Sequence, residues 1–444
     1  MAMEKQQLRF SVRRREPELV GPAAPTPRET KRLSDLDDHE TLRVQVKFAF
    51  FYRAGGKHDA AGVVRRALGE ALVPYYPLAG RVREVEERKL VVDCTGEGVL
   101  FVEADADVRL EELEEDGDGG GELRPPFPSM DQLLLDVEGS GGGVLGSPLL
   151  LVQVTRLLCG GFVLAVRVNH TMCDAIGAAQ FLLAVGELAR GLPAPTVRPA
   201  WCRELLDARS PPAPSFPHCE FDVVPPPPPP GDLVTRTFTF TAADVAAIRE
   251  GLPPRLRGTA TTFEALTAFL WRARTAALEL PDGEDARLVV IANLRGVAEL
   301  NLPGGYYGNA CVAPTAITTG EALLRRGSLG DAAEMVREAK AAVTAEYARS
   351  AADVLVLRGR PLLALSNVFV VSDHRHAGFH RLDLGWGEPA YGGGADVVFG
   401  LAFLVAVKNG GGGGESAVGA LVSLPPPAME RFASEMEKLY TRPN

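Results

Sequence analysis

The sequence lacks the features that mark membrane-bound and secreted proteins. No stretch of its 444 residues approaches the roughly 20 consecutive apolar residues that a membrane-spanning helix needs. The opening "MAMEKQQLRFSVRRREPE" contains no apolar segment of the kind found in secretory signals. We therefore predict a cytoplasmic protein that does not bind a membrane.

Cysteine pairs and an excess of basic charge are also missing. The six cysteines show neither a C-x-x-C pair nor metal-ligand spacing, which predicts free thiols and no bound metal. Acidic residues outnumber basic ones, 57 to 47, giving a net charge of −10 that argues against a general nucleic-acid binder. An anionic co-substrate is still compatible with this charge, because it needs only a local cluster of positive side chains.

The length and the proline distribution predict the domain organisation. A chain of 444 residues is too long for one core and suggests two large domains, or three small ones. The clearest break in composition is 208–231, where six consecutive prolines favour an extended segment. We predict an N-terminal domain at 1–207, a crossover linker at 208–231 and a C-terminal domain at 232–444.

Strand-like and helix-like segments alternate in both halves, which predicts an α/β fold. In the first half, 148–170 is expected to form a hairpin that turns at Cys159, Gly160 and Gly161. In the second half, helices are expected at 261–279 and 328–349, and a strand at 365–373.

The stretch "VNHTMCDAIG" at 168–177 places a histidine at the end of the second hairpin strand. His170 could exchange a proton near neutral pH, but a lone histidine there is more often structural. Asp174 is expected to cap the following helix. Cys173 could be a nucleophile, although a small buried apolar role is more typical.

A second segment, "DLGWG" at 383–387, gives His170 more significance. Together, H-x-x-x-D and D-L-G-W-G resemble the motif pair of the plant BAHD acyl-CoA-dependent acyltransferases, with Leu384 where the family usually has phenylalanine. Further matches occur along the chain, among them "YYPLAGRV", "TTFEALTAFLW", "NLRG" and "LPGGYYGN". The pattern is most similar to the branch of benzyl alcohol O-benzoyltransferases and taxane acetyltransferases.

This resemblance implies two domains of mixed sheet and helices, each like a chloramphenicol acetyltransferase subunit, with the active site in a channel at their interface. His170 would be the general base in a ternary complex, and Trp386 would orient the acyl carbonyl or the oxyanion, with a packed core tryptophan as the alternative. Asp174 would pair with Arg295 and hold the turn that carries the histidine. The remaining motif residues, expected to be structural, are Asp383, Gly385 and Gly387.

Binding residues follow from the same resemblance. Thr261 and Glu264, three residues apart, have the pattern of a capping box. Thr261 and Thr262 begin a helix whose free N–H groups suit the phosphates or the pantetheine arm of CoA, and a plain helix cap is the alternative. Tyr307 and Asn309 are candidates for binding the acceptor or for a scaffold role. Three further histidines, expected in a solvated loop rather than at a metal, are His374, His376 and His380.

The sequence therefore predicts transfer of a benzoyl, hydroxycinnamoyl or acetyl group from acyl-CoA to a small alcohol. No permanently bound cofactor is expected, and a monomer is favoured. Three alternatives stay open, namely an amine or polyamine acceptor, a non-catalytic ligand-binding homologue, and water as acceptor in a thioesterase.

Overall fold

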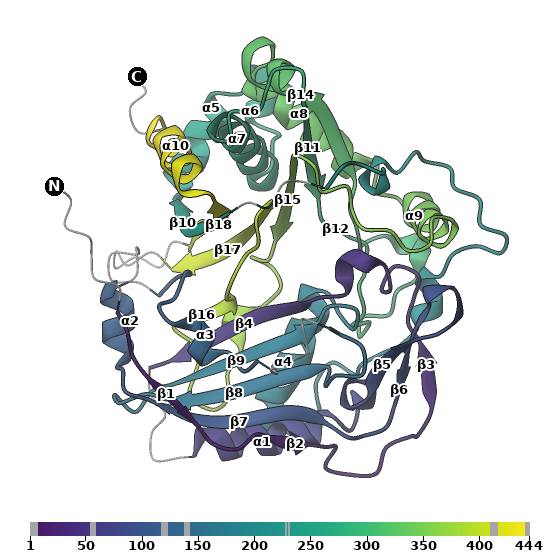
Figure 1. The fold of residues 1–444 in the computed structure, drawn as a ribbon, viewed down its shortest axis with the longest axis vertical. Helices are drawn as coiled ribbons and strands as arrows, with labels where there is room; N and C mark the ends of the chain where they lie inside the picture. The colour runs from purple at the N-terminus through teal and green to yellow at the C-terminus, as the bar shows by residue number, and fades with distance from the viewer. Residues whose placement is uncertain are drawn as a thin grey trace.

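Two large sheets form the body of the protein (Figure 1). The structure is a computed structural model, and it describes residues 8–53, 59–116, 123–136, 143–226, 229, 231–408 and 416–439. The first sheet has seven strands, with β2 (Glu18–Val20) pairing with β7 beside β1. Across this sheet the order is β1 (Val12–Arg14), β7 (Val99–Ala106), β8 (Leu150–Arg156), β9 (Phe162–Asn169), β4 (Gln45–Tyr52) and β16 (Tyr391–Gly394).

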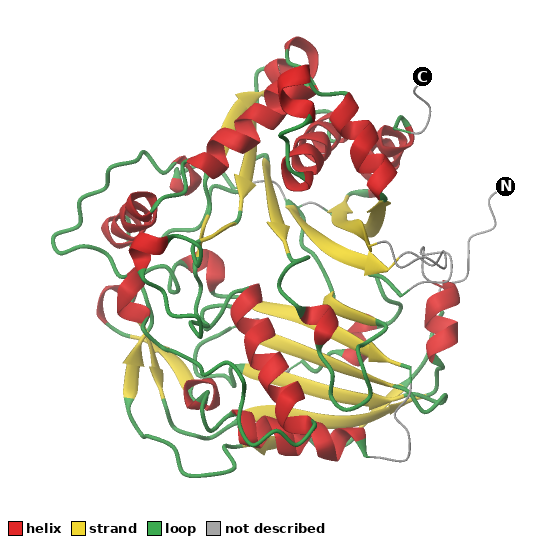
Figure 2. Ribbon diagram, turned by 180° about the vertical axis from the view of Figure 1, so that it is seen from behind, coloured by secondary structure: helices red, strands yellow, loops and turns green. Residues whose placement is uncertain are grey.

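Helices α1 (Ala60–Ala71) and α4 (Ala175–Ala189) pack against each other and share one apolar core with the first sheet (Figure 2). The opposite face of this sheet is covered by a smaller cluster that includes residues of α2 (Leu110–Asp116) and α3 (Met130–Leu133). Each strand of the hairpin is therefore buried on both faces, which explains its nearly continuous apolar sequence.

The second sheet has six strands and carries its helices on one face. The helices that share its core are α5 (Ala242–Glu250), α6 (Pro254–Arg257), α7 (Thr262–Ala277), α8 (Leu329–Ala341) and α10 (Pro426–Glu437). Its strand order is β10 (Val234–Phe240), β18 (Ser416–Leu424), β17 (Leu401–Lys408), β15 (Val368–Asp373), β11 (Asp285–Val290) and β14 (Thr315–Thr319).

Two small sheets and one further helix lie outside the two large sheets and their helices. The small sheets are β3 (Thr30–Arg32), β6 (Leu90–Asp93) and β5 (Arg81–Glu84), and β12 (Ala292–Asn293) with β13 (Cys311–Val312). Helix α9 (Ala345–Leu357) packs in a separate core cluster near them.

Strand β16 connects the two halves of the chain. It comes from the C-terminal half and pairs antiparallel with β4, so Tyr391 lies opposite Phe51 and Gly394 opposite Phe48. The sequence analysis missed this strand because glycine disfavours strands. Residues 1–207 therefore do not form the first sheet alone, and the proposed domain boundaries stay a prediction. Within the predicted linker at 208–231, Pro227, Pro228 and Pro230 lie outside the described residues.

The predicted hairpin is confirmed, since β8 and β9 pair antiparallel from Leu150 opposite Val168 to Arg156 opposite Phe162. The single helix predicted at 328–349 is wrong. It is two helices, because Thr344 is extended (φ −130°, ψ 172°) and its side chain accepts a hydrogen bond from the Tyr347 N–H at the start of α9. In the part of the chain that the structure describes, no helix has the length and apolar content to cross a membrane.

Candidate active site

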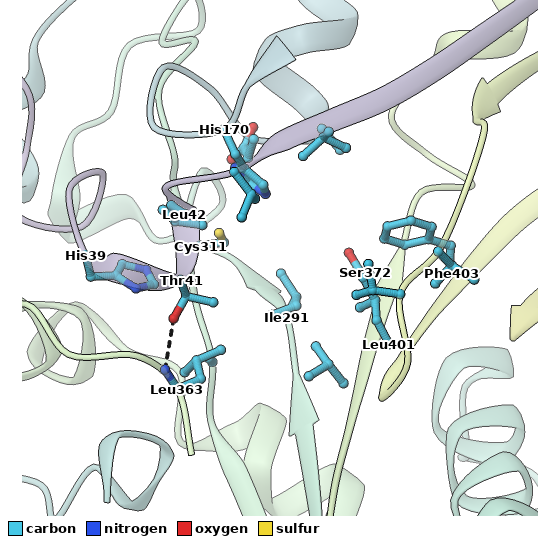
Figure 3. Close-up of a pocket in the computed structure, with 18 of the residues that line it drawn as sticks. His39, Thr41, Leu42, His170, Ile291, Cys311, Leu363, Ser372, Leu401 and Phe403 are labelled. Carbon is cyan, nitrogen blue, oxygen red and sulfur yellow. Dashed lines mark hydrogen bonds between the residues drawn. The ribbon is translucent and has the colours of Figure 1, made fainter. Parts of the chain in front are cut away.

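A cavity of about 540 Å³ lies where the end of β9 and the start of β4 meet β15 and β17 (Figure 3). Its walls are mostly apolar side chains from both sheets and from the loops between them. Those on the second sheet and its loops include Ile291, Leu363, Val370, Leu401 and Phe403. A cavity of this size and polarity suits a small organic molecule.

His170 lies in this cavity, directly after β9 ends at Asn169. Its backbone N–H donates to the Val44 carbonyl oxygen at 2.9 Å, and its own carbonyl oxygen accepts from Asn309 Nδ2 at 2.8 Å. These two bonds hold the backbone on both sides of the residue, while Figure 3 shows the imidazole pointing into the cavity. The strand end at which the sequence analysis placed His170 therefore lies in the cavity wall.

Burial of the imidazole lowers the pKa of His170 below its ordinary value. The Asp174 carboxylate and the Asn309 side chain oppose this shift but do not cancel it. Because a lowered pKa keeps the ring neutral near pH 7, His170 can accept a proton there.

Asp174 caps α4 and faces Arg295. Its Oδ1 accepts from the Gly177 N–H at 2.8 Å, and its Oδ2 accepts from the Ala310 N–H at 3.0 Å. The guanidinium of Arg295 donates to both carboxylate oxygens, at 2.8 and 3.0 Å. The structure therefore contains the predicted helix cap and the predicted ion pair.

The sequence analysis missed a second buried ion pair that holds the same turn. Asp37 pairs with Arg203 at 2.7 Å, and Arg203 also donates to the Met172 carbonyl oxygen at 2.6 Å. Asn309 donates from its backbone N–H and from Nδ2 to Asp37, at 2.9 and 2.8 Å. The acid-rich "LSDLDD" at 33–38 could have predicted a buried ion pair here, because carboxylates between leucines are buried only when they are paired.

Tyr307 and Asn309, the candidates for acceptor binding, do not line the cavity. Both are buried behind the turn, where Tyr307 packs edge-on against Tyr75 with ring centroids 5.1 Å apart. This geometry fits the scaffold role that the sequence analysis left open.

The Asp383–Gly387 motif forms a tight turn docked on α4. Asp383 accepts from the N–H groups of Gly385 and Gly387 at 2.8 and 2.9 Å, and both glycines have positive φ, 104° and 81°. Arg190, just after α4, donates to the Asp383 carbonyl oxygen. The predicted tight backbone path is present, and it leads the chain into β16 and the first sheet.

The geometry contradicts the predicted catalytic contact of Trp386. Its ring packs edge-on against Phe162 with centroids 5.1 Å apart, and Phe162 begins β9, whereas His170 follows its end. Eight strand residues span roughly 25 Å, so the indole cannot reach a carbonyl beside His170. The alternative of a packed core tryptophan fits, because Trp386 packs against the core of the first sheet.

Thr261 and Thr262 begin α7, away from the cavity lining. Thr261 caps the helix with Glu264 in a reciprocal capping box, as the sequence predicts. Basic side chains gather here, since Arg249 donates to Thr262 at 3.2 Å and Glu264 pairs with Lys340 at 2.7 Å. The arrangement offers local positive charge, and the CoA-binding role stays a prediction.

Cys173 lies in the cavity wall, where burial raises the pKa of its thiol to about 12. A thiol with this pKa is protonated near neutral pH and is a poor nucleophile. All six cysteines of the chain are free thiols in the structure, as the sequence predicts.

Two more histidines line the cavity, and the sequence analysis did not place either of them there. Burial lowers the pKa of His39 to about 3 and that of His374 to about 4, so both rings are neutral near pH 7. The prediction of a solvated loop is wrong for His374, whose ring stacks on Phe403 with centroids 4.3 Å apart. His376, in contrast, is exposed as predicted.

The model of the Transferase family matches residues 10–439. The chain belongs to this family, the BAHD acyltransferases. It is 49% identical over 449 residues to a benzyl alcohol O-benzoyltransferase of Petunia hybrida, covering 98% of this chain and 95% of that protein. It is 47% identical over 452 residues to a 13-hydroxylupanine O-tigloyltransferase of Lupinus albus, covering 99% and 97%.

Solved structures share the fold of this chain. Vinorine synthase superposes with a TM-score of 0.73 at 22% identity, covering 97% of this chain and 98% of that one. TRI101 of F. graminearum, complexed with coenzyme A and T-2 mycotoxin, gives a TM-score of 0.72 at 15% identity, covering 91% and 97%. The predicted fold, two chloramphenicol-acetyltransferase-like units of mixed sheet and helices, is thereby confirmed.

Proposed function

We propose that this BAHD acyltransferase moves an acyl group from acyl-CoA to the hydroxyl of a small, mainly apolar alcohol. The observation that carries this proposal is the neutral imidazole of His170 on the wall of an apolar cavity. The printed activities of the similar Petunia and Lupinus enzymes, an O-benzoyl and an O-tigloyl transfer, support the same class of reaction.

In the proposed reaction the alcohol oxygen attacks the thioester carbonyl carbon while the His170 imidazole accepts the hydroxyl proton. The C–O bond of the ester forms, and the carbonyl oxygen carries negative charge in a tetrahedral intermediate. When the C–S bond breaks, the imidazolium returns the proton to the CoA sulfur, so the products are an ester and free CoA. General-base catalysis of this kind typically contributes about 10²–10⁴-fold.

Cys173 takes no part in this scheme, because its thiol pKa of about 12 leaves it protonated. The proposal therefore has no acyl-enzyme and requires both substrates to be bound together. In that ternary complex Asp174, Arg295, Asp37 and Arg203 position the His170 turn without touching the reacting atoms.

The carboxylates in the cavity wall favour an alcohol over a cationic amine. Each is already paired with a side chain, for example Asp396 with Lys47 and Asp373 with Arg375, both at 2.8 Å. Glu220 is bonded to Tyr347 at 2.8 Å, and Asp174 is paired with Arg295. An ammonium group would find no unpaired carboxylate among the described residues of the wall, so burying its charge would be unfavourable.

We further propose that acyl-CoA approaches over the N-terminus of α7, where Thr262 in the first turn offers a free N–H group next to basic side chains and Thr261 is the N-cap. The coenzyme A in the TRI101 complex supports CoA as the acyl carrier, bound as a co-substrate. We also propose that the enzyme is a cytoplasmic monomer whose two domains are separated by the linker at 208–231.

The test is a matrix of acetyl-, benzoyl- and hydroxycinnamoyl-CoA against benzyl alcohol, other alcohols and amines, followed by release of the free CoA thiol. We expect ester formation with at least one alcohol and much weaker reaction with amines. Release of CoA with the free acid as the acyl product would indicate a thioesterase, and no release of CoA above the uncatalysed rate with any pair would contradict acyl transfer. Acyl transfer that is faster to amines than to alcohols would overturn the choice of acceptor.

A further inference from the structure

Three histidines line the cavity, and none of them has a partner for its buried Nδ1. These nitrogens, in His39, His170 and His374, have no hydrogen bond within the described residues. His218, which is buried elsewhere, differs because its two ring nitrogens lie 2.7 and 2.8 Å from a carboxylate and a hydroxyl oxygen. Buried polar atoms are nearly always paired, so these three rings are unusual. Because each Nδ1 is buried, the ring nitrogen that a bound molecule can reach is Nε2, which likewise has no hydrogen bond within the described residues.

The side chain of His39 is held in place by packing rather than by hydrogen bonds. It directly precedes a short 3₁₀ turn, Glu40–Leu42, but its side chain does not cap that turn. Its ring packs edge-on against Phe221 with centroids 6.0 Å apart. The neighbouring Thr41 oxygen already accepts from the Leu363 N–H at 2.9 Å, whereas the His39 ring makes no hydrogen bond to a described residue, so the imidazole is a polar group that this wall offers to a ligand (Figure 3).

The charge state of His39 limits what it can recognise. Its pKa of about 3 leaves the ring neutral, although Asp37, Arg43 and Arg360 are close enough to influence it. A neutral imidazole has one donor and one acceptor. It can therefore bind a hydroxyl or an ether oxygen, but it offers no charge to a phosphate or a carboxylate.

The position of His39 points to the acceptor rather than to acyl-CoA. Figure 3 shows His39 on one side of His170, with Ser372 and Phe403 of the second sheet on the other. The N-terminus of α7, where we propose that CoA approaches, belongs to the helical layer of that second sheet. The space beside His39 is therefore the part of the cavity left for the alcohol.

We propose that His39 is a specificity-determining residue, and this inference rests on the proposed function. Its imidazole hydrogen-bonds a second oxygen of the acceptor while the reacting hydroxyl contacts His170. The preferred acceptors would be alcohols with an apolar body and one further hydroxyl or ether group. The residues around this space, Leu42, Phe221 and Leu363, supply the apolar contacts.

The experiment measures kcat/KM with benzoyl-CoA and two matched sets of acceptors, the three hydroxybenzyl alcohols and the three methylbenzyl alcohols. A hydroxyl and a methyl group are similar in size, so their ratio at each ring position isolates the hydrogen bond. We expect wild-type enzyme to prefer at least one hydroxy isomer by about tenfold, the worth of one hydrogen bond. His39→Leu should abolish this preference, His39→Gln should retain part of it, and KM for benzoyl-CoA should not change.

The exposed His376 supplies the matched control, because His376→Leu removes an imidazole outside the cavity and should keep the wild-type ratio. An unchanged ratio in His39→Leu, or an altered KM for benzoyl-CoA with an unchanged ratio, would overturn the proposal. If His39→Leu does not fold, the wild-type ratios and His39→Gln decide, and wild-type enzyme without any preference contradicts it. Acylation of benzyl alcohol without that preference rejects only the role of His39, whereas no acylation of any alcohol rejects the proposed function itself.

Discussion

The two sequence motifs of this protein use the same local chemistry at opposite ends of one strand. In each, an aspartate accepts backbone N–H groups, Asp174 from Gly177 and Ala310, and Asp383 from Gly385 and Gly387. The first motif follows the end of β9 and places His170 in the cavity, whereas the second packs near the start of β9. A motif with an aspartate and an aromatic residue is thus not a reaction site unless the fold brings it to the cavity.

The charges around the two aspartates differ as well. Asp174 is largely buried and its ion pair with Arg295 is 2.8 Å long. Asp383 is about one-third exposed and lies 3.8 Å from Arg190. Removing charge should therefore have a large effect at the first motif and a small effect at the second.

The largest expected effect is on the rate after His170→Gln. Glutamine cannot act as a general base, so kcat should fall by about 10²–10⁴-fold, measured by release of CoA thiol. The melting temperature should stay close to that of wild type, because the His170 backbone bonds do not involve the imidazole. A loss of rate below tenfold would show that another group accepts the proton.

The second prediction compares the same substitution in both motifs. Asp174→Asn keeps a helix-capping oxygen but leaves the largely buried Arg295 without its carboxylate partner, and it should destabilise the protein by about 3 kcal/mol and reduce activity. Asp383→Asn keeps an oxygen that accepts from both glycines, so it should cost less than about 1 kcal/mol. Chemical denaturation measures both values, and equal losses would contradict the proposed difference between the motifs.

The third prediction concerns pH. Protonation inactivates His170 as a base, so kcat/KM should fall by up to about tenfold per pH unit below the pKa of this residue. Burial lowers that pKa, which places the midpoint below the ordinary value of about 6.5 and leaves the rate level between pH 7 and 8. Rates measured from pH 5 to 8 test this, and a midpoint above pH 7 would disagree with a desolvated imidazole.

The smallest expected effect is that of Trp386→Phe. If Trp386 packs against Phe162 and does not touch the reacting atoms, phenylalanine should preserve most of the contact and kcat should change by less than about threefold. A residue that stabilises the oxyanion would instead cost about 10²–10³-fold. The same assay of CoA release separates the two outcomes, and a loss in the higher range would restore the catalytic role that the geometry contradicts.

Local features of the fold were predictable, because each depends on neighbouring residues. The hairpin turning at Gly160, the cap of α4 by Asp174 and the capping box of Thr261 with Glu264 all appear where the sequence places them. The break before α9 was missed, since the helical pattern continues through Thr344.

Features that join distant segments were harder to predict. Strand β16 exists because β4 offers it an edge to pair with, although its glycines disfavour a strand. The pairing of Asp37 with Arg203 likewise depends on a long-range contact, and no local pattern indicates which arginine will reach a buried carboxylate.

The sequence by itself determined the family, the strand that ends at His170 and the aspartate that begins α4. Only the tertiary structure decided that His39 and His374 share the cavity with His170 and that Trp386 does not. Both outcomes depend on how the two sheets pack, which places side chains far apart in sequence on one wall and puts roughly 25 Å of β9 between the two motifs. Local sequence patterns predict where strands and helices form, whereas the packing of the whole chain determines which side chains come into contact.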